Sequence, residues 1–358
     1  MRSRFAIDWW LLSPVLILVC LSLATLFSID VAFFRSQLIS FLVSLVAFLF
    51  FTRINLGFLK QLKLIFYVGS LVLLGILFIV GIESRGAVRW LTIFGTSIQF
   101  SEFIKPFLSV AFASFLANAA FSKRKTYVMT ILLLLPIFSL IVIQPDLGSG
   151  LIFAFVVILT LLVYGFPLYL FGLTLLPIVL SLPLIWNFMH EYQRQRVLTL
   201  FHPTVDPLGT SYNSIQAIIA VGSGSFFGRG WFEGTQSTLR FLPERHTDFI
   251  FATLAEGLGF FGATLVLFVF AFLCYRVYLI FQNSTDTFSR LFAVCCFGFF
   301  FIQGVVNIGM NVGILPIVGV TLPFVSFGGN SLLSNFIFLG ILSAISVSQK
   351  KERVLEIR

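Results

Sequence analysis

The sequence predicts an all-α, polytopic membrane protein with about ten transmembrane helices, both termini in the cytoplasm, and one long extracytoplasmic loop between helices 7 and 8. Two observations predict this fold class. Apolar residues make up 59% of the chain and the mean hydropathy is +1.05, values outside the range of soluble globular domains. Apolar runs close to the length of about 20 residues that crosses a bilayer also recur along the whole chain.

The predicted helices follow the apolar runs in order. They cover residues 9–28, 33–52, 64–82, 103–119, 127–143, 149–165, 167–187, 248–279, 290–312 and 326–347. Most connections between them are short, but residues 83–102 and 188–247 form longer ones. We expect 1–358 to be a single integral membrane domain, with 188–247 as an extracytoplasmic loop that carries short interfacial or re-entrant helices. Ile215–Val221 is apolar enough to dip into the membrane surface as part of such a helix.

Lysine and arginine in the short connections predict the orientation, because cytoplasmic loops carry an excess of both. With the N-terminus inside, most of them fall on the inner side. These are Arg2, Arg4, Arg53, Lys60, Lys63, Lys123, Arg124, Lys125, Arg276, Arg290, Lys350, Lys351, Arg353 and Arg358, against Arg35, Arg85, Arg89 and Lys105 outside. Acidic residues gather at the outer side instead: Glu83, Glu102, Asp146, Glu191, Asp206, Glu233, Glu244, Asp248 and Glu256. Any chemistry is therefore expected at the outer face.

Composition also excludes several classes of function. The net charge of +9 is scattered between apolar runs and forms no basic face for phosphates, so we expect no nucleic-acid partner. All four cysteines lie inside apolar segments without CxxC spacing, which favours neither disulfides nor a cysteine metal site. The first apolar run leads into the second without a small-residue cleavage site, so no cleavable signal peptide is predicted.

The strongest candidate for a functional site is the stretch Phe241–Ala252, Phe-Leu-Pro-Glu-Arg-His-Thr-Asp-Phe-Ile-Phe-Ala. Five ionisable or hydroxyl side chains occupy positions 244–248, directly before a long apolar run. In a chain that is only 10% charged, this cluster at a water–membrane boundary predicts a site.

The long loop holds two further candidates. Arg194 and Arg196 lie two residues apart, so an extended backbone would direct both guanidinium groups to one face, where they suit a phosphate or pyrophosphate; lipid headgroups are an equal alternative. The glycines of 222–230 have GxGxxxG spacing without a preceding strand, which disfavours a nucleotide loop. They predict close backbone approach to a bulky anionic ligand, or close helix packing at a re-entrant segment.

Polar residues next to other predicted helices form a third group. Glu102 and Lys105 are spaced i, i+3, which allows an ion pair. Asp146 lies in a Pro/Gly turn and could be only a helix cap. A polar, glycine-rich stretch ends helix nine and begins helix ten, and its small residues also allow close packing. It contains Asn307, Asn311, Pro316, Gly319, Pro323, Ser326, Phe327, Gly328, Gly329, Asn330 and Ser331.

A tight zinc site is not favoured, because His190, His202 and His246 show no short ligand spacing. A weakly bound Mg²⁺ or another divalent cation, held by carboxylates and a substrate phosphate, leaves little sequence signature and is the cofactor we expect, if any.

These segments together resemble the SEDS family (shape, elongation, division and sporulation) along essentially the whole chain. The motifs, in order, are Arg85, Arg89 and Trp90; Ser101-Glu102 with Lys105; Gln144-Pro145-Asp146-Leu147-Gly148; Tyr192-Gln193-Arg194-Gln195-Arg196; Gly222-Ser223-Gly224; Leu242-Pro243-Glu244 to Ala252; and Pro323-Phe324-Val325-Ser326-Phe327-Gly328-Gly329. The sequence departs from the family pattern at Ala217, Ser225, Arg229 and Gly257. Asp8-Trp9 and Arg245 are more similar to the elongation branch than to the division branch.

The resemblance implies a peptidoglycan glycosyltransferase that polymerises lipid II at the outer face of a bacterial cytoplasmic membrane. It implies Asp248 as the catalytic residue, with Glu102, Lys105, Gln216 and Ser326 in substrate-binding motifs. The implied partners are lipid II and the nascent lipid-linked glycan, a class B penicillin-binding protein that crosslinks the strands, and other membrane proteins of the elongation complex.

The implied reaction moves a growing glycan from undecaprenyl pyrophosphate to the 4-hydroxyl of the next lipid II. Such a hydroxyl is a poor nucleophile, so we expect Asp248 to act as general base, with Arg194, Arg196, Arg245 and a divalent ion on the leaving pyrophosphate. The alternative is a transporter that flips the lipid-linked precursor. The crowding of charge at one face, and the lack of a visible internal repeat, favour the enzyme.

Overall fold

A computed structural model describes residues 7–84, 87–93, 96–189, 194–195, 198–199 and 211–356. Among these residues, seven helices are long and apolar enough to cross a membrane. They are α1 (Trp9–Ile29), α2 (Val31–Phe51), α7 (Lys123–Ile143), α8 (Leu147–Tyr164), α13 (Ile250–Asn283), α14 (Thr287–Asn311) and α15 (Gly329–Glu356). Three more have shorter apolar stretches: α4 (Lys63–Val80), α6 (Lys105–Ala117) and α9 (Leu168–Phe188). The chain is therefore a mostly helical, multi-pass membrane protein, as predicted, and each predicted segment carries a helix.

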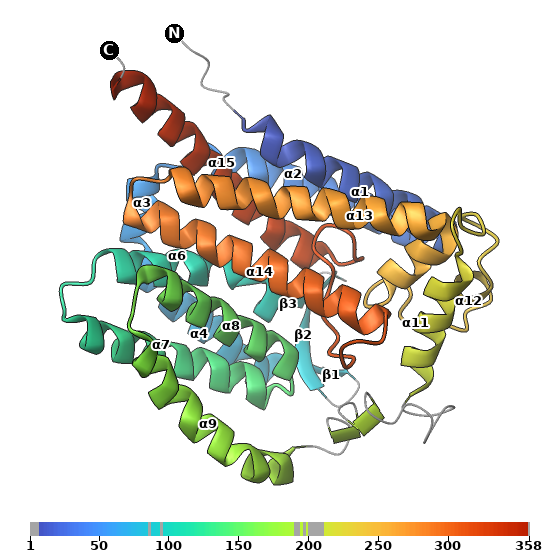
Figure 1. Ribbon diagram of the computed structural model, residues 1–358, viewed down its shortest axis with the longest axis horizontal. Helices are drawn as coiled ribbons and strands as arrows, with labels where there is room; N and C mark the ends of the chain where they lie inside the picture. The colour runs from blue at the N-terminus through green and yellow to red at the C-terminus, as the bar shows by residue number, and fades with distance from the viewer. Residues whose placement is uncertain are drawn as a thin grey trace.

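Helix α14 forms the centre of the bundle (Figure 1). It packs against α13 on one side and against α8 and α6 on the other. Two-thirds of its span, 67%, is buried, against 17% for α2, whose exposed apolar side chains suit a lipid environment. The start of α1 and the end of α15 lie at one end of the bundle, and α11 (Tyr212–Ser223) and α12 (Thr235–Thr238) at the other. The sidedness relative to a membrane stays a prediction.

The structure adds a small sheet that the sequence did not predict. Strands β1 (Ile82–Ser84), β2 (Ala87–Ile93) and β3 (Thr96–Gln99) pair antiparallel in chain order. They lie in the connection predicted as 83–102. The sheet leads into α5 (Phe100–Phe103), and Ile104 separates α5 from α6, so the helix predicted over 103–119 is in two parts. The strands are short, and their hydrogen bonds depend on pairing, which no local pattern reveals.

Helix α13 is broken at Gly259, where the sequence predicted one uninterrupted helix over 248–279. Gly259 has φ 69° and ψ −161°, a conformation that favours glycine. The N–H groups of Phe260 and Phe261, which lose their helical acceptors, donate to the carbonyls of Ser225 (2.8 Å) and Phe226 (3.3 Å). The loop after α11 thus completes the hydrogen bonding of the break.

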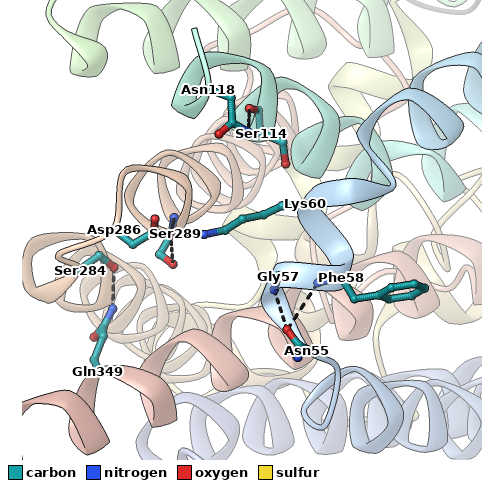
Figure 2. Close-up of polar contacts among 10 residues, drawn as sticks. All are labelled: Asn55, Gly57, Phe58, Lys60, Ser114, Asn118, Ser284, Asp286, Ser289 and Gln349. Atoms are coloured by element: carbon teal, nitrogen blue, oxygen red, sulfur yellow. Dashed lines mark hydrogen bonds and ion pairs between the residues drawn. The ribbon is translucent and has the colours of Figure 1, made fainter. Parts of the chain in front are cut away.

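A set of polar contacts ties α3 (Leu56–Gln61) and α15 to the turn between α13 and α14 (Figure 2). Lys60 on α3 extends toward Asp286 and forms an ion pair at 2.8 Å. Asp286 is the N-cap of α14 and accepts from the N–H (3.2 Å) and the hydroxyl (3.1 Å) of Ser289. Gln349 of α15 donates to Ser284. These contacts fix the helix ends far from α11 and α12.

Candidate functional site

The segment that precedes α13 folds into a compact turn. The N–H groups of Thr247 and Phe249 both donate to the carbonyl of Glu244, at 3.1 and 3.2 Å. Phe249 is the N-cap of α13, and its side chain makes no capping bond. Asp248 therefore lies one residue before the cap, so the structure does not give it the N-cap position of a purely structural aspartate.

Two asparagines of α14 hold the backbone of Asp248. The side-chain amides of Asn307 and Asn311 each donate to the carbonyl oxygen of Asp248 at 3.0 Å. The side-chain oxygen of Asn311 also accepts from the N–H of Ala252 at 3.0 Å. Both asparagines are fully buried. Because they are one turn apart on the largely buried helix α14, they fix the position of Asp248 relative to the core.

The turn around Ser326 holds the two residues before Asp248. The hydroxyl of Ser326 donates to the carbonyl of Thr247 at 2.8 Å, and the N–H of Phe327 donates to the carbonyl of His246 at 2.9 Å. The His246 ring stacks on Phe33 of α2, with ring centroids 4.1 Å apart. The structure therefore brings Ser326 to the segment of Asp248, although through backbone contacts; its predicted role in binding substrate stays a prediction.

Gln37 of α2 forms two hydrogen bonds with the turn around Ser326. Its side-chain amide donates to the carbonyl of Ser326 at 3.2 Å, and its oxygen accepts from the N–H of Gly328 at 3.2 Å. Gln37 is fully buried. The sequence analysis did not identify it, and its only signal was a glutamine within an apolar helix.

The Asp248 carboxylate is half-buried and lies beside the connection between α14 and α15. A Cβ atom built on Gly319 would be 3.5 Å from Asp248 Oδ2, so the backbone passes close to the carboxylate there. The neighbouring Val318 packs directly on Gly148 at the start of α8, next to Asp146. Residues 318–320 thus lie between Asp248 and the start of α8.

Asp146 is the N-cap of α8, but its carboxylate does more than cap the helix. It accepts from the N–H of Ser149 at 3.3 Å and, also at 3.3 Å, from the side chains of Gln99 and Ser101. It therefore joins the end of the sheet to α8 at the side of the 318–320 segment.

Glu102 and Lys105 form the predicted ion pair, between the adjoining helices α5 and α6. Both side chains are buried, and Lys105 Nζ lies 5.8 Å from the ring centroid of Phe299 on α14. The pair therefore contacts the helix that carries Asn307 and Asn311. Whether it binds substrate stays a prediction.

The structure describes three of the four candidate binding residues in and near the long loop. Arg196 lies outside the described residues. Arg194 donates from Nε to the carbonyl of Trp186 (2.8 Å) and from Nη2 to the carbonyl of Asn187 (2.6 Å), so its guanidinium contacts the end of α9. Gln216 is half-buried on α11. Arg245 is half-buried and lines a pocket with Arg240.

Helix α11 packs onto the start of α13 through a small apolar cluster: Ala217, Ala220, Leu242, Phe249 and Ala252, all buried. Ala217 is one of the departures from the family pattern, and its methyl group fits this cluster. The cluster surrounds the residue next to Asp248, so α11 contributes to the position of the candidate base.

The glycine-rich loop packs on the broken part of α13. A Cβ atom on Gly224 would lie 2.0 Å from the carbonyl oxygen of Ala255, and one on Gly228 would lie 2.1 Å from that of Gly257. The N–H groups of Arg229 and Gly230 donate to the carbonyls of Glu256 (2.9 Å) and Gly257 (3.0 Å). The glycines of this loop therefore allow close packing on α13, and the re-entrant position of the segment stays a prediction.

Glu256, which the sequence analysis placed only at the outer face, anchors the next part of the loop. Its buried carboxylate accepts from the N–H groups of Gln236 (2.8 Å) and Ser237 (3.0 Å) and from the hydroxyl of Ser237 (2.7 Å). A carboxylate with three donors is a stable buried arrangement. Glu256 therefore fixes α12 against α13.

The fold and the site define a multi-pass membrane protein with a half-buried carboxylate held at the junction of a loop and the bundle. The family model described as cell cycle protein, which covers FtsW, RodA and SpoVE, matches residues 3–351. The chain belongs to this family, the SEDS family that the motifs resemble.

Two relatives illustrate the similarity in sequence. Peptidoglycan glycosyltransferase MrdB of Escherichia coli K12 is 40% identical over 287 residues, which cover 79% of this chain and 77% of that protein. Probable peptidoglycan glycosyltransferase FtsW of Hydrogenovibrio crunogenus is 32% identical over 372 residues, 99% of this chain and 95% of that protein.

Solved structures show the same fold. One comes from work on the structural coordination of polymerization and crosslinking by a peptidoglycan synthase complex. It has a TM-score of 0.83 at 29% identity and covers 96% of this chain and 99% of that one. The crystal structure of the rod shape determining protein RodA of Thermus thermophilus has a TM-score of 0.74 at 26% identity. The match covers 96% of this chain and 98% of that one.

Proposed function

We propose that this protein is a peptidoglycan glycosyltransferase that polymerises lipid II, with Asp248 as its general base. The observation that carries the proposal is the way Asp248 is held. Its backbone and that of the two preceding residues accept hydrogen bonds from Asn307, Asn311, Ser326 and Phe327, while Asp248 is only half-buried. A base on a rigid support reacts without first having to be ordered.

In the proposed reaction, the Asp248 carboxylate accepts the proton of the 4-hydroxyl of the acceptor sugar. The oxygen then attacks the anomeric carbon of the donor glycan, the bond from that carbon to the pyrophosphate oxygen breaks, and undecaprenyl pyrophosphate leaves with the bonding electrons. General-base catalysis of this kind contributes about 10²–10⁴-fold to the rate.

Positive charge near the leaving group would stabilise its developing negative charge. Arg245 lies three residues before Asp248 and contributes such a charge. The guanidinium of Arg194 already contacts two carbonyls of α9, which favours Arg245 for this role. The described residues include no cluster of three or more His, Cys, Asp or Glu side chains. A weakly bound Mg²⁺, if present, would be held by carboxylate and substrate pyrophosphate oxygens and would neutralise charge on the leaving group.

The side of the membrane, the partner protein and the cellular role of the activity are also part of the proposal. The distribution of lysine and arginine in the short connections supports an orientation in which the Asp248 end of the bundle faces outside the cytoplasmic membrane of a bacterium. The likeness to a chain of a peptidoglycan synthase complex supports a crosslinking partner, a class B penicillin-binding protein, and the similarity to MrdB and RodA supports a role in cell elongation.

The test compares purified wild type with Asp248→Asn in two assays: polymerisation of lipid II and flipping of a lipid-linked precursor across vesicles. We expect wild type to polymerise, and the variant to remain folded and lose at least about 10²-fold of that activity. Near-normal polymerisation by Asp248→Asn would remove Asp248 from the role of base. Flipping without polymerisation by wild type would favour the transporter.

A further inference from the structure

A second polar site lies between the end of α1 and the loop that follows α12. Ser28 and Ile29 of α1 form one wall of this pocket, and Trp231, Ser237, Thr238, Arg240 and Arg245 form the rest. Figure 1 shows α12 at the same end of the bundle as the end of α1. One of the lining residues, Ser237 of α12, is held in place by Glu256.

Two guanidinium groups, those of Arg240 and Arg245, line this pocket. Neither Arg240 nor Arg245 forms an ion pair with any residue in the described part of the chain. The Nε atom of Arg245 is buried and has no hydrogen-bond acceptor there. A buried donor without an acceptor is unfavourable, and more so when the group is charged, so an anionic acceptor at this position would be stabilising.

The electrostatic surroundings of Arg245 also favour an anionic ligand in this pocket. Burial lowers the pKa of its guanidinium and the charge of Arg240 lowers it further, while Asp30 acts in the opposite direction. The carboxylate of Asp30 accepts from the N–H of Ala32 at 2.7 Å and caps α2. An anion between the two arginines would remove their repulsion.

The hydroxyl groups of the pocket already donate to the protein. Ser28 donates to the carbonyl of Thr25 (2.7 Å), Ser237 to Glu256 (2.7 Å), and Thr238 to the carbonyl of Phe232 (3.3 Å). The guanidinium groups are therefore the main donors left for a ligand. This selects a charged, oxygen-rich group such as a phosphate over a neutral sugar.

The surroundings of the pocket are apolar and exposed. Phe27, Phe232, Leu239 and Phe241 are between 47% and 62% exposed, and the rings of Phe27 and Phe232 lie 6.3 Å apart. Arginines beside exposed phenylalanines suit a molecule with an anionic head and a hydrocarbon tail.

From these observations we propose that the Arg240–Arg245 pocket binds the phosphate group of a membrane lipid. Two sources have this chemistry: the pyrophosphate of the lipid-linked substrate, an assignment that rests on the proposed function, and the headgroup of an anionic phospholipid. Arg240 is the residue newly assigned to binding.

Native mass spectrometry of the purified full-length protein tests the site without turnover. The probes are undecaprenyl pyrophosphate, phosphatidylglycerol, and dioleoylglycerol, which has similar tails and no phosphate. The variants are Arg240→Gln, Arg240→Lys and the control Arg35→Gln, which removes the charge of an exposed arginine on α2 that does not line the pocket. Thermal melting checks that each variant is folded.

We expect wild type to retain at least one phosphate lipid over dioleoylglycerol, and Arg240→Gln to bind that lipid about tenfold more weakly. Arg240→Lys should recover only part of the affinity, because lysine lacks the bidentate fork, and Arg35→Gln should bind as wild type does. Preference for undecaprenyl pyrophosphate identifies the substrate as the source, and preference for phosphatidylglycerol identifies a phospholipid. Equal retention of dioleoylglycerol, or wild-type binding by Arg240→Gln, overturns the site and leaves the polymerisation test unaffected.

Discussion

The side-chain amide of Asn307 donates to the carbonyl oxygen of Asp248 at 3.0 Å, so the central helix of the bundle directly holds the candidate base. The same amide donates to the carbonyl of Val320 at 2.7 Å. Asn307 therefore joins the backbone of the base to the segment that passes beside its carboxylate. The geometry around Asp248 depends on a residue that has no chemical role of its own.

Asn307→Ala should lower kcat for lipid II polymerisation by about 10-fold to 10²-fold with a smaller change in KM. The substitution leaves the carbonyls of Asp248 and Val320 without this donor, and a misplaced base affects turnover more than binding. Steady-state kinetics with purified protein measure the effect.

Gln303 provides a matched control one turn away on α14. It is buried, and neither end of its side chain has a hydrogen-bond partner in the part of the chain that the structure describes. Gln303→Met should therefore keep the wild-type kcat. Equal losses in the two variants would mean that α14 is sensitive to any substitution and that Asn307 has no special role.

Gln37→Leu should destabilise the Ser326 turn and reduce polymerisation. The side chain of Gln37 makes two hydrogen bonds to that turn, and each buried partner left unpaired costs about 1–3 kcal/mol. Thermal melting and the polymerisation assay together measure the change. Ser44→Ala on the same helix should match wild type, because the buried hydroxyl of Ser44 has no hydrogen-bond partner among the described residues. A fully active, equally stable Gln37→Leu protein would contradict the support that we assign to Gln37.

Gly224→Ala should destabilise the loop on α13 and lower activity, because the new methyl group would lie 2.0 Å from the carbonyl oxygen of Ala255. Overpacking of this kind typically costs about 1–3 kcal/mol. Gly222 is the matched control, since a Cβ atom there meets no atom within 4 Å. Gly222→Ala, within α11, should be neutral or slightly stabilising. The expected order of melting temperatures is Gly222→Ala at or above wild type, and Gly224→Ala below; the reverse order would rule out the close contact.

The helices could be predicted from the sequence because an apolar run is a local signal. The sequence also singles out the segment of Asp248, because five ionisable or hydroxyl residues occupy positions 244–248 in a chain that is only 10% charged; the function of this segment stays a prediction. Long-range packing could not be predicted. Gln37 is 289 positions from Ser326, and nothing near it in the sequence indicates that contact. The break at Gly259 likewise depends on the carbonyls of Ser225 and Phe226, which accept the N–H groups that the break releases.

Arg194 shows a different limit of prediction from the sequence. Its spacing from Arg196 predicted a phosphate or pyrophosphate ligand, or lipid headgroups as an equal alternative, but a guanidinium group also suits the free carbonyls at a helix end. The structure shows the second arrangement for Arg194, at the end of α9. Residue type and spacing alone do not distinguish these two partners.

The ion pair between Lys60 and Asp286 should give the protein a pH-dependent part of its stability (Figure 2). Burial alone would raise the pKa of Asp286, but hydrogen bonds from Lys60 and Ser289, together with the charge of Lys60, lower it on balance. A carboxyl whose pKa is lower in the folded state stabilises that state above its unfolded pKa, near 3.9, and loses this contribution as the pH falls through the folded value.

Asp286→Asn isolates the charge, because asparagine is also a good N-cap for α14. At pH 7 we expect the variant to be less stable by about 0.2–1 kcal/mol, since both side chains are partly exposed and solvent screens the pair. The difference should shrink at high salt, and it should be lost as the pH falls below the unfolded value and through the lower folded pKa of Asp286. Thermal melting of both proteins over this pH range measures it. A difference in stability between the two proteins that persists at low pH would mean that the substitution acts through capping geometry and not through charge.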